Sequence, residues 1–220
     1  MARRTLTPAT IVDAAVAIAA RAEPNGLTGR ALGEALGVDR SAVWRHFADQ
    51  DALLRAVGDR LVQLALAAVP DGLAPHHRMM ALARALVATF AAHPHVGAAI
   101  AARTTQGPGE IDAVEFTLQA LREAGVPRDQ LARQQRALAD AILGYAGFRA
   151  ARALLSEEIR QRDQQAWMGA YATVSPVTHP AIAEHVVDLA AVTDDDVLET
   201  LLTALWAAVQ TVVDHAEGTR

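Results

Sequence analysis

The stretch that decides the fold is residues 28–54, which read TGRALGEALGVDRSAVWRHFADQDALL. Thr28 is a favourable N-cap for a short helix, and Gly37 supplies the tight turn that would end it. Asp39 can cap a second short helix, which Val43 and Phe47 are expected to anchor by their apolar side chains. Two short helices joined by a tight turn are typical of a helix-turn-helix, in which the second helix keeps one face free for a DNA groove.

Helix signals continue on both sides of this stretch. Thr7 and Pro8 are typical of an N-cap followed by a first helical residue, and Pro24-Asn25-Gly26 is expected to end that helix. Asp49 is expected to cap a further helix that contains Leu53-Leu54. The inward face of the first helix is predicted to be Ile11, Ala14, Ala15, Ile18 and Ala22.

Beyond a hinge near Pro70 the pattern changes to longer helices, with proline or glycine at most junctions. We expect these helices at residues 77–92, 95–103, 110–124, 128–166, 180–190 and 194–216. The sequence contains no run of alternating β-branched residues and no internal repeat. It therefore predicts an all-α fold, with an N-terminal helix-turn-helix domain in residues 1–62 and a larger C-terminal helical domain in residues 63–220.

Composition and charge narrow the class of protein. The chain has 220 residues, of which 52% are hydrophobic and 20% charged, as in a folded domain pair with a real core. The absence of cysteine excludes disulfides, thiolate catalysis and cysteine-ligated metals. No signal-peptide pattern is present, and residues 197–213 are flanked by acids, so we expect a buried helix, no membrane contact and a cytoplasmic location.

The net charge of −5 argues against nucleic acid only weakly, because the distribution of charge matters more than its total. The first 60 residues carry eight arginines and seven acids, so the whole excess of acids lies further along. Every cationic side chain is arginine, which favours bidentate contacts to bases and phosphates. A GC-rich genome would produce the same bias.

Residues 28–54 resemble the DNA-binding domain of TetR-family transcriptional regulators. The motifs in register are Gly37-Val38, Trp44-Arg45-His46-Phe47 and Leu53-Leu54. The resemblance covers about residues 5–62, and beyond them it extends only to the organisation of the helices. Two positions depart from the family pattern, because Trp44 replaces the usual tyrosine and Gln50 the usual lysine. We therefore expect weaker phosphate contacts than is usual in the family.

The resemblance implies roles for individual residues of the N-terminal helix-turn-helix domain. Those that look like base readers are Arg40, Ser41, Ala42 and Arg45. Those that look like contacts to the DNA backbone are Thr28, Arg30, Trp44, His46 and Gln50. Physical chemistry supports the arginines independently, because an outward guanidinium can clamp O6 and N7 of guanine. Without the motif, solvated surface arginines would be the ordinary interpretation.

The C-terminal domain is expected to hold a small-molecule effector among its middle helices, as the family does. Aromatic and amphipathic side chains are scarce here, so the candidates are Arg103, Phe116, Gln119, Gln135, Tyr145, Phe148, Trp167 and Tyr171. Ordinary core packing or a dimer interface remains the alternative for each.

The sequence supports other classes of function, such as an enzyme, a metal sensor or an interaction protein, less well. The acidic runs Asp194-Asp195-Asp196 and Glu157-Glu158 are typical of helix starts and solvated faces rather than of catalysis. His93-Pro94-His95, and His179 with Glu184-His185, raise the possibility of a metal sensor, but neither has a third ligand or an HExxH spacing. A helical interaction protein with a degenerate DNA head is a further alternative. We predict no catalytic residue, no cofactor and no metal.

The sequence and the resemblance together predict a repressor. Two chains would form a homodimer through the helices at 128–166 and 194–216, because a helix that is apolar on two faces needs cover on both. The dimer would bind a palindromic operator in double-stranded DNA. Effector binding would move the fourth helix and release the protein from DNA.

Overall fold

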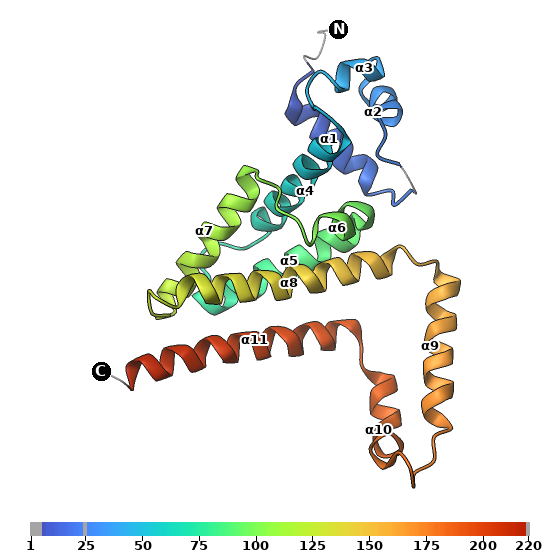
Figure 1. Ribbon diagram of the computed structural model, residues 1–220, viewed down its shortest axis with the longest axis vertical. Coiled ribbons are helices and arrows are strands. Elements are labelled where there is room, and N and C mark those ends of the chain that lie inside the picture. The colour runs from blue at the N-terminus through green and yellow to red at the C-terminus, as the bar shows by residue number, and fades with distance from the viewer. Residues whose placement is uncertain (1–5, 24–25, 219–220) are drawn as a thin grey trace. The chain divides into compact units, whose positions relative to one another are not determined.

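The computed structural model describes residues 6–23 and 26–218 (Figure 1). Every regular element in these two ranges is a helix, which confirms the predicted all-α fold. The chain forms two compact units, one of residues Met1–Leu154 and Trp206–Arg220 and one of residues Leu155–Leu205.

Four helices at the N-terminus form the head. They begin where the sequence places N-caps: Thr28 accepts from the amide of Ala31 at 3.1 Å, and Asp49 accepts from the amide of Ala52 at 2.7 Å. Thr7 is likewise a cap. The helices are α1 Pro8–Ala19, α2 Gly29–Leu36, α3 Arg40–Val43 and α4 Gln50–Ala67.

The inward face of α1 agrees with the prediction only in part. Ile11, Ala15 and Ile18 are buried, whereas Ala14 is half-buried and Ala22 is exposed. Ala22 lies outside the helix because α1 ends at Ala19. Of the three residues expected to stop this helix, Pro24 and Asn25 lie outside the described residues.

The body continues the same unit with helices that begin at proline or follow a turn. Helix α8 runs alongside α5 and α6, and α4 contacts α5, α6 and α7 (Figure 1). Their shared core includes Phe90, Ile100 and Leu121. The helices are α5 Pro75–Ala92, α6 Pro94–Ile100, α7 Pro108–Glu123 and α8 Leu131–Ala153, and the unit also holds the end of α11 Asp194–Glu217.

The prediction of one continuous helix over 128–166 is wrong. Helix α8 ends at Ala153, and a new helix, α9 Glu157–Ala172, begins after Ser156. Ser156 acts as its N-cap, because the Ser156 hydroxyl accepts from the amide of Ile159 at 3.2 Å. In the second unit, α9 packs against α10 Pro180–Ala191.

Helix α4 runs without a break through residue 62, where we placed the boundary between head and body. That boundary therefore falls inside a helix and stays a prediction. In the described part of the chain one helix, α11 over Asp194–Ala216, is long and apolar enough to cross a membrane. Core helices of folded proteins pass the same test when they are mostly buried, but only 22% of the apolar window of α11 is buried within the chain. The expectation of a buried helix therefore holds for one face only, where Leu202, Trp206 and Val209 are buried and Trp206 stacks against His76 with 4.8 Å between ring centroids.

Candidate nucleic-acid interface

The turn between α2 and α3 holds the two helices in close contact. Gly37 adopts the left-handed conformation, with φ of 67°, and the amide of Val38 bonds the Gly33 carbonyl at 2.9 Å. A methyl group on Gly33 would lie 2.8 Å from the carbonyl oxygen of Val38, so a side chain there would push the turn away. The sequence Gly33 to Val38 therefore fixes the helix-turn-helix geometry locally.

Helix α3 is shorter than the sequence suggested. We expected it to extend to Phe47, but only Arg40–Val43 is helical, and Trp44 to His46 form a turn closed by the His46 amide on the Val43 carbonyl at 3.0 Å. This is a bond between residues three apart, the usual tightening at the end of a helix. Phe47 is nevertheless half-buried.

The four candidate base readers lie at the start of α3 and just after it. Arg40, Ser41 and Arg45 are exposed, and Ala42 is half-buried. Hydrogen bonds from Ser41 lower the pKa of Asp39, and the charges of Arg40 and Arg45 lower it further. The Asp39 carboxylate is thus held ionised as the cap of α3, accepting from the Ser41 amide at 2.8 Å.

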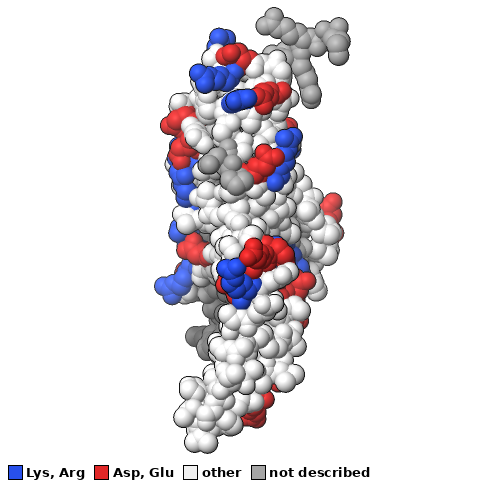
Figure 2. Space-filling view, turned by 90° about the vertical axis from the view of Figure 1, so that its right-hand side faces the viewer, with Lys and Arg blue, Asp and Glu red and all other residues white. Residues whose placement is uncertain are grey.

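The candidate contacts to the DNA backbone surround this unit. The Arg30 side chain pairs with Glu34 at 2.9 Å and is highly exposed, and His46 is exposed as well. The Thr28 hydroxyl oxygen accepts from α2, which leaves its hydrogen available to a phosphate. Trp44 lies against Gly29. On the face drawn in Figure 2, arginines and acids are interspersed over the head at the upper end.

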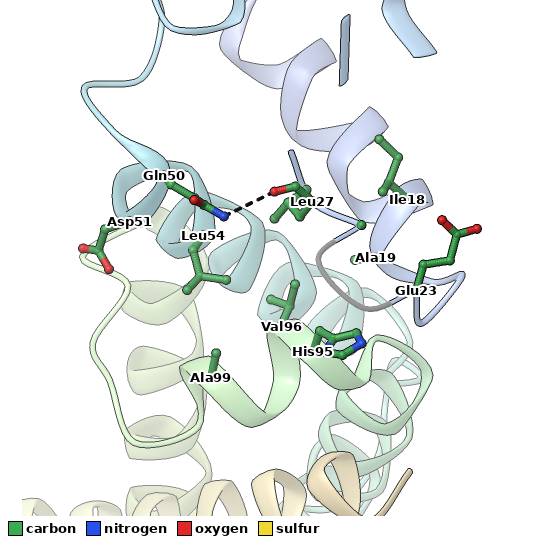
Figure 3. A pocket seen from close by; sticks show the side chains of 11 residues that line it. Ile18, Ala19, Glu23, Leu27, Gln50, Asp51, Leu54, His95, Val96 and Ala99 are labelled. Carbon is green, nitrogen blue, oxygen red and sulfur yellow. Dashed lines mark hydrogen bonds between the residues drawn. The ribbon is translucent and has the colours of Figure 1, made fainter. Parts of the chain in front are cut away.

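Gln50, the remaining candidate, has an internal partner. Its side-chain amide donates to the carbonyl of Leu27 at 3.4 Å, across a hollow of about 350 Å³ (Figure 3). This hollow lies between the head and α6, and His95 of α6 contacts the carbonyl of Ala22 at 3.2 Å. Its walls are mainly apolar, formed by Ile18, Ala19, Leu27, Leu54, Val96 and Ala99.

Arg103, predicted as an effector contact, lies at the same junction of head and body. Its guanidinium pairs with Asp51 in the first turn of α4 at 2.7 Å, and Arg55 approaches the same carboxylate at 3.2 Å. The hydrogen bond and the charge of Arg103 lower the pKa of Asp51. This ion pair therefore joins the segment after α6 to the start of α4.

A buried carboxylate, which the sequence did not reveal, joins α4 to α7. Asp59 is only 5% exposed. It accepts from the amides of Gly109 and Glu110, each at 2.9 Å, and from the Thr105 hydroxyl at 2.8 Å. Gly107, the N-cap residue of α7, has no side chain that could cap the helix, so Asp59 caps α7 from another helix. Two features of the sequence could have indicated this contact. Asp59 is an acid within the apolar face of a helix, and Gly107-Pro108-Gly109 begins a helix without a capping side chain.

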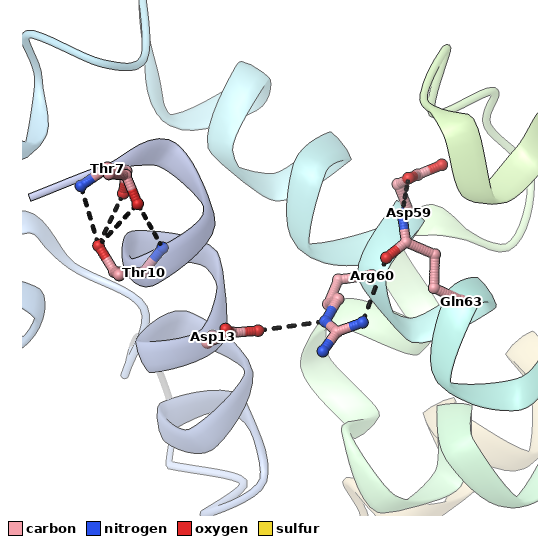
Figure 4. Close-up of polar contacts among 6 residues, drawn as sticks. All are labelled: Thr7, Thr10, Asp13, Asp59, Arg60 and Gln63. Atoms are coloured by element: carbon pink, nitrogen blue, oxygen red, sulfur yellow. Dashed lines mark hydrogen bonds and ion pairs between the residues drawn. The ribbon is translucent and has the colours of Figure 1, made fainter. Parts of the chain in front are cut away.

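The residues near Asp59 on α4 tie this helix to α1 (Figure 4). Gln63 donates to Asp59 at 3.1 Å and accepts from Arg60 at 3.2 Å. Arg60 in turn pairs with Asp13 of α1 at 3.1 Å. A chain of polar contacts thus runs from α1 of the head, along α4, to the first turn of α7.

The other candidate effector residues do not meet at one place. Within the first unit, the Arg78 guanidinium lies over the Phe116 ring. Gln119 is exposed and bonded to Glu115, and Gln135 is half-buried. The Tyr145 and Phe148 rings on α8 are 6.2 Å apart, and in the second unit the Trp167 and Tyr171 rings meet edge-on at 4.7 Å. None of the eight lines the hollow of Figure 3 or a second hollow of about 340 Å³ among α5, α7 and α11. Their role in effector binding stays a prediction.

The histidines that suggested a metal have other partners. His93 contacts the carbonyl of Thr89 at 2.9 Å, and His95 contacts Ala22. Thr178 and His179 are bonded at 2.9 Å, and His185 lies 3.6 Å from Asp188. Among the described residues no group of three or more potential ligands lies close enough to hold a metal ion.

A capped helix-turn-helix with exposed arginines, joined by one long helix to a helical body, defines a DNA-binding regulator of the helix-turn-helix class. Residues 11–57 match the family model of bacterial regulatory proteins of the tetR family, and residues 75–212 match that of the tetracyclin repressor-like C-terminal domain. The chain belongs to the TetR family. No curated protein sequence gives a significant match.

Solved structures support the same assignment. A TetR transcriptional regulator from Streptomyces coelicolor is 25% identical, with a TM-score of 0.80 over 95% of this chain and 100% of its own. ActR of the same organism, in complex with actinorhodin, shares the fold at 20% identity, with a TM-score of 0.82 over 97% and 99%. BioQ, bound to its double-stranded DNA operator, is 26% identical, with a TM-score of 0.57 over 75% and 98%.

Proposed function

We propose that this chain is a cytoplasmic transcriptional repressor that binds a palindromic operator as a homodimer and leaves it when a small molecule binds the body. The observation that carries the proposal is the capped α2 and α3 pair, which exposes Arg40 and Arg45. The relatives fit both halves of this function, because BioQ was solved on its operator and ActR with actinorhodin. The proposed function requires no catalytic residue, cofactor or metal.

The nine proposed DNA contacts divide by chemistry. Arg40, Ser41, Ala42 and Arg45 read base edges. Thr28, Arg30, Trp44, His46 and Gln50 contact the phosphate backbone, of which Trp44 and Gln50 offer only neutral donors. The Gln50 amide has two N–H donors, of which one is bonded to the Leu27 carbonyl at 3.4 Å, so a phosphate can take the second donor or replace this long bond. A bond of this length is weak and costs little to lose.

The homodimer is proposed to form through α8 and α11. Because α8 ends at Ala153, the proposed interface is shorter than the helix at 128–166 that the sequence predicted. Phe148 of α8 is 57% exposed, although it is one of the few aromatic side chains of the protein. A large exposed apolar side chain of this kind is typical of an interface. The effector is proposed to bind in the body, with Arg103, Phe116, Gln119, Gln135, Tyr145, Phe148, Trp167 and Tyr171 as candidate contacts.

The experiment that tests operator binding is selection of duplexes from a random-sequence library by the purified protein. We expect a palindrome with half-sites about one helical turn apart, roughly 34 Å or more. Arg40→Ala and Arg45→Ala should relax preference at particular bases, while Arg30→Ala should weaken binding to all sequences alike. Recovery of no sequence would favour a helical interaction protein with a degenerate head.

A further inference from the structure

The indole of Trp44 lies against the first residue of α2. A methyl group built on Gly29 would be 2.6 Å from Nε1 of Trp44, 3.0 Å from Cε2 and 3.1 Å from Cζ2. Non-bonded carbon atoms prefer about 3.5–4.0 Å, so no side chain fits at residue 29 while the ring keeps this position. The backbone of Gly29 is not in the left-handed region, so the ring of Trp44, and not the backbone conformation, calls for glycine there.

The ring also lies at the end of the recognition helix. Trp44 is the C-cap of α3 and directly precedes Arg45 in the chain. It is 36% exposed, so part of the indole is packed and part faces solvent. Because Trp44 lies between Arg40 and Arg45 in the chain, a change in the packing of its ring acts on the segment that carries both exposed arginines.

We propose that Gly29 and Trp44 form a size-matched pair that sets the position of α3 on α2 and so the direction in which Arg40 and Arg45 are presented to DNA. This inference rests on the operator binding proposed above. Both members are positioning residues. The pair explains how the head accommodates the bulkiest side chain at residue 44, because the missing side chain at residue 29 leaves the room for it.

A second close contact of α2, with the turn that leads to α3, is made to the backbone and not to a side chain. Gly33 meets the backbone carbonyl of Val38, so a larger residue at 33 clashes whatever the neighbouring side chains are. The contact at Gly29, in contrast, is with a ring and can be relieved by a narrower one. This difference makes the pair testable by a double-mutant cycle.

The cycle compares the wild type, Gly29→Ala, Trp44→Tyr and the double variant, with duplexes that the wild type has itself selected from a random library. Gly29→Ala alone should weaken binding by about twofold to tenfold, the equivalent of one strained side-chain torsion. The same substitution in the Trp44→Tyr background should change affinity little, because the phenol ring is narrower. Gly169→Ala is the control for glycine replacement in a helix, since nothing described lies within 4 Å of that site.

An equal loss in both backgrounds, or no loss in either, overturns the pairing. If Gly29→Ala fails to fold and the double variant folds, the clash with the indole is established; failure of both overturns it. If the wild type selects no sequence, the proposed operator binding is wrong, whatever the role of the Gly29–Trp44 pair. The same four proteins then test the pair by thermal melting, where Gly29→Ala should lower Tm only when Trp44 is present.

Discussion

At the scale of single residues, Asp59 is the one charged side chain that is buried among the described residues. Its carboxylate is buried, and backbone amides of α7 supply two of its hydrogen bonds. Hydrogen bonds to a charged group are worth more than neutral ones, and a buried amide left without an acceptor is costly. The side chain therefore determines both where α7 starts and how it lies on α4.

We expect Asp59→Ala to lower the free energy of unfolding by about 2–3 kcal/mol, the loss of a charged cap together with unpaired amides. Chemical denaturation followed by circular dichroism measures this change. Asp71→Ala, which removes an exposed loop carboxylate, serves as the control and should have almost no effect. Equal stability of the two variants would contradict the capping role.

Glu110 gives the protein a pH-dependent contribution to stability. Burial raises the pKa of Glu110, but hydrogen bonds from the hydroxyl of Thr104, the amide of Gln106, and the hydroxyl and amide of Thr105 outweigh it and hold the pKa below its ordinary value of 4.5. The stabilisation is present above the ordinary pKa and is lost as the pH falls through the lower, folded value. Glu110→Gln should therefore lower Tm at pH 7, and the difference from the wild type should shrink as the pH falls below the ordinary pKa of 4.5 and vanish at more acid pH. A difference that stays constant with pH would disprove this account.

At the scale of elements, α4 and α6 approach closely because α4 has no side chain at residue 58. A methyl group on Gly58 would lie 2.5 Å from Cγ1 of Ile100, which is itself buried. Gly58→Ala should therefore destabilise the protein by about 1–3 kcal/mol, as overpacking does. Gly169→Ala, at an open helical site, should instead be neutral or slightly stabilising. Thermal melting distinguishes the two outcomes, and a stabilised Gly58→Ala would show that the two helices can move apart.

The elements also show what the sequence could predict. Caps such as Thr28 and Asp49 act between neighbours in the chain, so their side chains alone locate the helix starts. The end of α8 was missed because Leu154 and Leu155 are good helix formers and no proline or glycine marks the break. Asp59 was missed for a different reason, since its partners on α7 lie some fifty residues away and only the folded chain brings them together.

At the scale of the whole molecule, the expected dimer can be tested with two aromatic residues of different surroundings. Phe148 is largely exposed, whereas Trp206 is buried and stacks on His76 of its own chain. Phe148→Glu should shift sedimentation from dimer to monomer while leaving the helical content unchanged. Trp206→Glu should unfold the protein, because it buries a charge. A Phe148→Glu variant that remains fully dimeric would place the interface elsewhere.

The continuity of α4 has a consequence for exchanging parts between regulators. Arg60 faces the head and Asp59 faces the body, so adjacent positions of one helix belong to different neighbours. A chimera cut at residue 62 would carry both side chains with the head and graft them onto a foreign body, whose helices need not offer backbone amides to receive Asp59. A working head swap would have to leave Asp59 with its own body or import the start of α7 with it. The transferable module of this regulator is therefore defined by the faces of α4 and not by a point along the chain.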